Sequence, residues 1–159
     1  MGNKNFKNCC LIVLILVMLL SITACGKEKE AISAEEFKSI MEGLGLTVSD
    51  QSNSVNGDTQ QYIYVATDME KYSFEYYYMD SNADADDLYN YAVNGVANSH
   101  KDSKHATTVE NNNAFEQSYA VSFDDYYVHV AKIQNAVLFV TAYPDYKTES
   151  QFIIKKLGF

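Results

Sequence analysis

The sequence predicts an α+β domain: a largely antiparallel sheet of about five to six strands with three helices, in the order α-β-β-β-α-β-β-β-α. Several segments alternate apolar and polar residues with period two, which is typical of strands. Three others repeat apolar residues at helical spacing behind helix-start signals. Most links between strands are too short for the crossovers that parallel neighbours require. We expect the helices to cover one face of the sheet.

The first helix has the clearest signals. Ser33 and Glu36 stand in the spacing of a capping box, and Ile32 with Phe37 fits the hydrophobic staple around it. Phe37, Ile40, Met41 and Leu44 repeat at helical spacing. Gly43 or Gly45 is expected to end the helix.

The strands are predicted from alternation of β-branched and aromatic residues. In the third strand, Tyr72, Phe74, Tyr76 and Tyr78 fall on one side and Tyr77 on the other. Polar residues 99–113 are expected to form a loop. The expected strands are 46–49, 61–67, 71–79, 114–123, 126–133 and 136–143.

Two further helices are expected. One covers about 83–98, with acids in its first turn, where the helix dipole favours negative charge, and with Ser81 or Asn82 as its N-cap. The other follows Pro144, where Thr148 and Gln151 repeat the capping-box spacing. The apolar stripe of the helix at 83–98 contains Ala85, Leu88, Tyr89, Ala92 and Val96. The apolar stripe of the helix after Pro144 contains Phe152, Ile153 and Leu157.

The first 24 residues have the layout of an export signal. Lys4 and Lys7 precede an apolar run, which ends in Ile22-Thr23-Ala24-Cys25. The run is short for a membrane span, which needs roughly 20 apolar residues.

Those four residues resemble the lipobox of bacterial lipoproteins. The resemblance implies cleavage between Ala24 and Cys25 and attachment of diacylglycerol to the Cys25 thiol, with long acyl chains such as palmitate as the anchor. It predicts a cleaved signal at 1–24, a lipid-anchored tether at 25–31 and a single α+β extracytoplasmic domain at 32–159. The location implied is the outer face of the cell membrane. A composition rich in Lys, Asn, Tyr and Ile and free of Arg favours a Gram-positive host. In its architecture and its leader, the chain resembles the small lipoproteins of Gram-positive bacteria.

Charge and cysteine content exclude several classes. The chain carries −9 with 12 Lys and 21 acids; loss of Lys4 and Lys7 leaves 10 Lys, and −11. Such a domain is a poor partner for nucleic acid. The three cysteines are Cys9, Cys10 and Cys25, so after cleavage and acylation no thiol remains for a disulfide, a nucleophile or a zinc site.

No catalytic, metal or cofactor site is predicted. Residues 80–84 begin like an EF-hand, but Ala85 and Tyr91 stand where that loop needs Gly and Glu. His100, Asp102 and His105 are close in sequence but lie in an expected loop without the spacing of metal ligands. His129 is expected on the same side of its strand as Tyr127 and Ala131, without the surroundings of a nucleophile.

The tyrosine content is the unusual feature: all 13 tyrosines follow residue 61. Many are expected in the core, but an exposed aromatic surface could also bind a partner. The candidate contacts are Tyr77, Tyr62 and Tyr64. The leading hypothesis is a non-enzymatic module that binds an envelope protein, peptide or glycan. The alternatives are a cell-envelope hydrolase with paired acids and an accessory subunit of an envelope complex.

Overall fold

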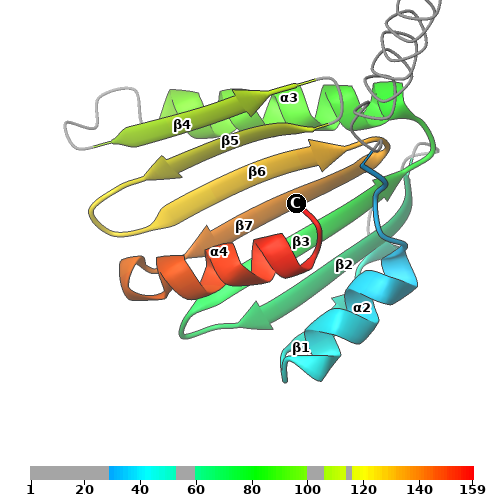
Figure 1. The fold of residues 1–159 in the computed structure, drawn as a ribbon, viewed down its shortest axis with the longest axis horizontal. Coiled ribbons are helices and arrows are strands. Elements are labelled where there is room, and N and C mark those ends of the chain that lie inside the picture. The colour runs from blue at the N-terminus through cyan, green and yellow to red at the C-terminus, as the bar shows by residue number, and fades with distance from the viewer. Residues whose placement is uncertain (1–28, 53–59, 100–105, 114–115) are drawn as a thin grey trace, which may run out of the picture.

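The structure is a computed structural model of the chain, and it describes residues 29–52, 60–99, 106–113 and 116–159. Within these ranges the fold is α+β, with a seven-stranded antiparallel sheet in the order β1-β2-β3-β7-β6-β5-β4 (Figure 1). The elements are α2 (Ala34–Gly43), β1 (Thr47–Asp50), β2 (Gln60–Asp68), β3 (Tyr72–Met79), α3 (Asn82–Ser99), β4 (Thr107–Asn112), β5 (Gln117–Ser122), β6 (Tyr127–Ile133), β7 (Ala136–Ala142), the 3-10 turn η3 (Pro144–Tyr146) and α4 (Lys147–Lys156).

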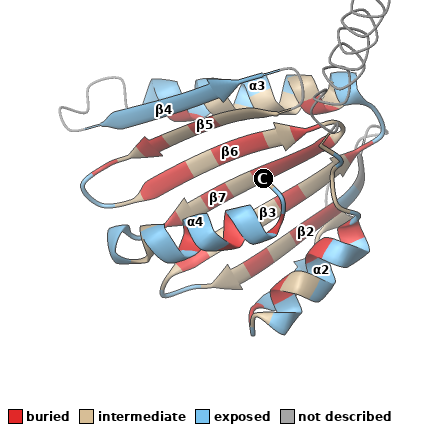
Figure 2. Cartoon of the chain, viewed as in Figure 1, coloured by how far each residue is buried: buried red, intermediate tan, exposed pale blue. Residues whose placement is uncertain are grey.

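The predicted strand number was too low, because β4 was expected to be loop. All of its residues are exposed, and it carries no apolar alternation (Figure 2). It is an edge strand held by one neighbour, with Thr107 opposite Ser122 and Asn112 opposite Gln117. The next strand accordingly begins at Gln117 rather than at 114. Pairing with β5, not side-chain burial, makes this segment a strand.

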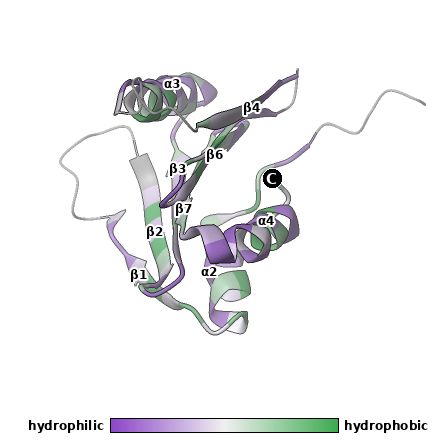
Figure 3. Ribbon diagram, turned by 90° about the vertical axis from the view of Figure 1, so that its left-hand side faces the viewer, coloured by the Kyte–Doolittle hydropathy of each residue, from purple (hydrophilic) through white to green (hydrophobic). Residues whose placement is uncertain are grey.

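The helices lie on both faces of the sheet, contrary to the expectation that they cover one (Figure 3). α2 and α4 pack on one face against a core that includes Phe74, Tyr76 and Leu138. α3 packs on the other face against Val130 and Val137. The central strands carry apolar residues on both sides, so each side requires a cover.

Local helix signals were confirmed at two starts. The Ser33 hydroxyl accepts a hydrogen bond from the Glu36 amide at 3.1 Å, and Ile32 and Phe37 both pack into the core. Ser81 likewise accepts from the Asp84 amide at 3.1 Å. Gly45, with φ of +84°, follows the end of α2 in the left-handed conformation that glycine favours.

The capping box predicted for the last helix was wrong. α4 begins at Lys147, directly after η3, and no side chain caps it. Thr148 is therefore already inside the first turn. The preceding 3-10 turn leads the chain into the helix, so a separate side-chain cap is not formed.

The described end of the predicted tether contacts the domain. The Lys29 ammonium lies 2.7 Å from the Glu116 carboxylate, and Ala31 packs against the core. The buried Tyr76 hydroxyl donates to the Ile32 carbonyl. These contacts attach the segment entering α2 to the sheet.

Candidate functional site

A groove lies between α3 and the sheet. Two cross-strand pairs line it from the sheet: Glu75 of β3 is opposite Phe139 of β7, and Tyr77 is opposite Val137. These four side chains point to the α3 side because they alternate with the core residues of the opposite face. We call this cavity the α3 groove; its volume is about 440 Å³.

α3 lines the groove with one stripe of its surface: Leu88, Tyr91, Ala92, Gly95, Val96 and Ser99. Toward the end of the helix this stripe includes the small residues Ala92, Gly95 and Ser99. A side-chain carbon built on Gly95 meets no atom within 4 Å. Small residues at helical spacing thus keep the space open.

A hydrogen bond joins two of the polar groups of the groove. The Tyr77 hydroxyl donates to Oε2 of Glu75 at 2.6 Å. Burial, followed by the bond to Glu75 and the negative charge of that carboxylate, raises the pKa of Tyr77. Tyr77 therefore stays a protonated donor, and the other carboxylate oxygen of Glu75 receives no bond from it.

The α3 groove has one charged side chain, that of Glu75, among its lining residues. In the part of the chain that the structure describes, no lysine forms an ion pair with it. Lys132, opposite Val137 on the same face of the sheet, is paired with Asp86 instead. The remaining lining is mainly apolar or aromatic. Glu75 is thus a half-buried carboxylate with a single tyrosine donor.

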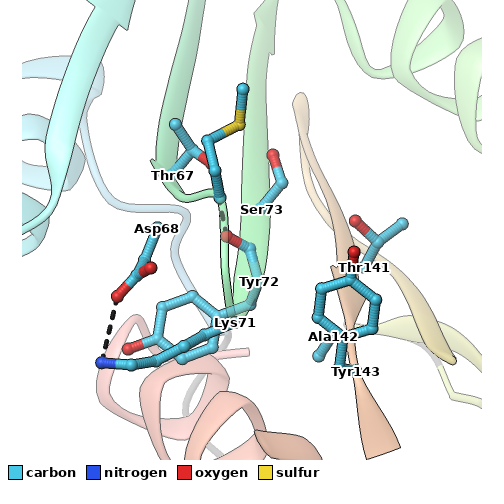
Figure 4. A pocket seen from close by; sticks show the side chains of 9 residues that line it. Thr67, Asp68, Lys71, Tyr72, Ser73, Thr141, Ala142 and Tyr143 are labelled. Atoms are coloured by element: carbon cyan, nitrogen blue, oxygen red, sulfur yellow. Dashed lines mark hydrogen bonds and ion pairs between the residues drawn. The ribbon is translucent and has the colours of Figure 1, made fainter.

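A smaller polar pocket of about 240 Å³ lies at the ends of the same strands. A row of hydroxyls crosses β2, β3 and β7 in this pocket, from Thr67, Ser73 and Thr141. Ser73 precedes Glu75 by two residues on β3, so the row lies on the same face of the sheet as Glu75. In Figure 4, Asp68 and Lys71 are joined on one side of this pocket and the Tyr143 ring lies beside Thr141 on the other. Since its two charges neutralise each other, this pocket has no unpaired ion to attract a ligand.

A third cavity, the α4 pocket, lies on the opposite face beside α4 and has a volume of about 300 Å³. His129 and Lys147 are among its lining residues. The Lys147 ammonium donates a hydrogen bond to the Ser122 hydroxyl at 2.7 Å and lies 5.3 Å from the centre of the Tyr127 ring. His129 shares the Tyr127 side of the strand, as predicted, with its Nδ1 3.0 Å from the Tyr127 hydroxyl oxygen. Burial lowers the pKa of His129 to about 4. His129 therefore stays neutral near pH 7.

The three tyrosines predicted as contacts do not form one surface. Tyr77 lines the α3 groove. Tyr62 is 38% exposed and stacks near Tyr64 on the other face of the sheet. Tyr64 is buried in the core with α2, so its ring is not available to a ligand. Tyr62 is opposite Tyr78, the neighbour of Tyr77 on β3. Successive side chains of a strand point to opposite faces of the sheet, so Tyr62 and Tyr77 do as well.

Sequence reasoning missed Tyr91, Phe139 and Glu75 as groove residues. Tyr91 is 80% exposed at the groove and falls outside the apolar stripe of its helix. The signal was present in the spacing from Leu88 through Tyr91 to Gly95, which aligns them on one side of the helix. Phe139 and Glu75 become neighbours only through strand pairing.

Several predicted positions lie outside the described residues: Ala24, Cys25, His100, Asp102 and His105. Within the described ranges, no group of three His, Cys, Asp or Glu side chains is arranged to hold a metal ion. No helix of those ranges has both the length and the apolar character needed to cross a bilayer.

Comparison with known proteins gave no match: no family model, no curated protein and no solved structure is significantly similar to the chain. The site must therefore be interpreted from its own geometry and chemistry.

Proposed function

We propose that the protein is a lipid-anchored extracytoplasmic binding module, without enzymatic activity, whose site is the α3 groove. The observation that carries this proposal is the groove itself: about 440 Å³ of space lined by aromatic rings, with Glu75 and Tyr77 hydrogen-bonded at the sheet. Ligand sites of that size are typically mainly apolar, with a few polar groups that orient the ligand. Tyr77 is one of the contacts predicted from the sequence.

The aromatic side chains favour binding. Tyr77, Tyr91 and Phe139 offer large rigid surfaces that lose little conformational entropy on binding. A ligand that covers Tyr91 would bury a ring that is 80% exposed in the free protein. That burial supplies hydrophobic free energy, while Glu75 supplies specificity.

The groove does not favour the hydrolase alternative. Glycoside hydrolysis of the usual kind uses two carboxyl groups about 5 to 10 Å apart on either side of the bond that breaks. Glu75 is the sole carboxylate of the groove lining. A single acid can fill only one of the two roles, protonation of the leaving group or nucleophilic attack, and leaves the other unfilled.

The proposed anchor rests on the lipobox residues, and the position of Lys29 limits the distance between Cys25 and the domain. Cys25 precedes Lys29 by four residues, and Lys29 is paired with Glu116 of the domain. Four residues span at most about 14 Å. An acylated Cys25 would therefore hold this side of the domain close to the membrane surface.

Acyl labelling tests the anchor. The wild-type chain and Cys25→Ala are expressed in a Gram-positive host fed an alkyne analogue of palmitate, and the label on each protein is measured. We expect label on the wild type and none on Cys25→Ala. Equal labelling of the two proteins would refute the anchor.

A groove-filling variant tests the binding site. Gly95→Trp projects an indole into the groove, whereas Gly43→Trp adds the same ring to α2, where the space is also open. Each protein without its first 24 residues is incubated with envelope extract, and retained molecules are identified by mass spectrometry. We expect retention by the wild type and Gly43→Trp, and its loss in Gly95→Trp. Identical retention by all three would contradict the proposed site.

A further inference from the structure

The charge of the α3 groove identifies the chemistry of its ligand. Glu75 is the one charged lining residue, and α3 itself contains no lysine. The whole chain carries −9. Lys132 is opposite Val137 on the same face of the sheet, but its ammonium is paired with Asp86 of α3 at 2.8 Å. Glu75 is therefore the one charge in the described lining, and that lining offers an anion no cation.

Desolvation makes this charge decisive. A ligand that fills the groove removes water from the Glu75 carboxylate, and a buried carboxylate is strongly disfavoured unless a partner replaces that water. The Tyr77 hydroxyl replaces part of it, at 2.6 Å from Oε2. A neutral apolar ligand leaves the other oxygen of the Glu75 carboxylate without a hydrogen-bond partner, and an anionic ligand adds charge repulsion. A cation compensates the charge.

The lining distinguishes an organic cation from a metal ion. Calcium takes six to eight oxygen ligands, and magnesium is octahedral. The groove offers one carboxylate among aromatic and aliphatic side chains. Rings such as Tyr77, Tyr91 and Phe139 instead attract alkylated ammonium groups, through their negative faces and their apolar area.

Resting on the proposed function, we propose that the α3 groove binds a small organic ammonium cation, with Glu75 as its counter-ion and the rings of Tyr77, Tyr91 and Phe139 around its alkyl groups. Tyr77 has a second role as positioning residue, since its hydrogen bond orients the carboxylate.

The test compares choline with 3,3-dimethylbutan-1-ol, which has the same shape without the charge. Binding to the domain without its first 24 residues is measured by NMR titration. We expect choline to bind at least tenfold more tightly than the neutral alcohol. Equal affinity for the two compounds would overturn the inference.

Matched variants assign the preference to Glu75. Glu75→Gln removes the charge but retains a carbonyl oxygen for the Tyr77 hydroxyl. Glu35→Gln removes the same charge from an exposed position on α2, on the other face. We expect the tenfold preference to fall to about twofold or less in Glu75→Gln and to persist in Glu35→Gln. A preference retained by Glu75→Gln would also overturn the inference, provided that the amide spectrum shows a folded domain.

The two proposals can fail separately. If choline shows no preference but Gly95→Trp still abolishes retention from envelope extract, the ammonium inference is wrong and the binding groove stands. If Gly95→Trp changes neither choline binding nor retention, the groove is not the site, and both proposals fall.

Discussion

Protonation of His129 should destabilise the fold as the pH falls toward 4. Its Nδ1 is 3.0 Å from the Tyr127 hydroxyl oxygen, and its Nε2 is enclosed with no hydrogen-bond partner among the described residues. Burial lowers the pKa to about 4 from the ordinary 6.5, although the Glu116 carboxylate acts in the opposite direction. The neutral ring is therefore the form that the folded protein accommodates.

Proton linkage gives the direction in which the stability of the fold changes with pH. Because the pKa is lower in the folded state, the unfolded chain binds the proton more readily, and the folded state loses stability as the pH falls from about 6.5 to about 4. Well above 6.5 the ring is neutral in both states, and the penalty vanishes. The separation of the two pKa values corresponds to about 3 kcal/mol in total, at about 1.4 kcal/mol per pH unit. Between pH 7 and pH 5 the expected loss is about 2 kcal/mol.

Urea unfolding at pH 7 and pH 5 measures this loss. His129→Gln is the reference, since it cannot titrate but keeps an oxygen that can accept from the Tyr127 hydroxyl. The other histidines, His100 and His105, are common to both proteins, so their contribution cancels in the comparison. We expect the wild type to lose about 2 kcal/mol more than His129→Gln between the two pH values. Parallel changes in the two proteins would refute the argument from burial.

Three further predictions concern stability, each measured by the urea midpoint. Gly95→Ala should stabilise the protein by about 0.5–1 kcal/mol, because Gly95 is a helical glycine with open space around its missing side chain; a destabilised variant would contradict this. Tyr76→Phe should cost about 1–2 kcal/mol, because it leaves the Ile32 carbonyl without the buried hydroxyl donor; an unchanged midpoint would show that water takes its place. Ser33→Ala should cost about 1 kcal/mol through loss of the cap on the Glu36 amide, and Ser33→Thr should restore most of it.

The alternation of the inner strands and the starts of α2 and α3 were predictable from the sequence, because they depend on neighbours in the chain. Ser33 and Ser81 cap their helices through residues three positions away. Tyr76 and Tyr77 were assigned to opposite sides of one strand by the period of two, and the structure places Tyr76 in the core and Tyr77 in the α3 groove. The lipobox is also read from consecutive residues, Ile22-Thr23-Ala24-Cys25. The lipid anchor inferred from it stays a prediction.

Only the tertiary structure decided which elements meet. β4 is a strand because β5 pairs with it, although its six residues are all exposed. The choice of α3 for one face and of α2 and α4 for the other depends on how the chain crosses the sheet. The groove exists because β3 and β7 pair Glu75 with Phe139 while Gly95 leaves space above them. These residues are separated by up to 64 positions, from Glu75 to Phe139, and local periodicity carries no information over that distance.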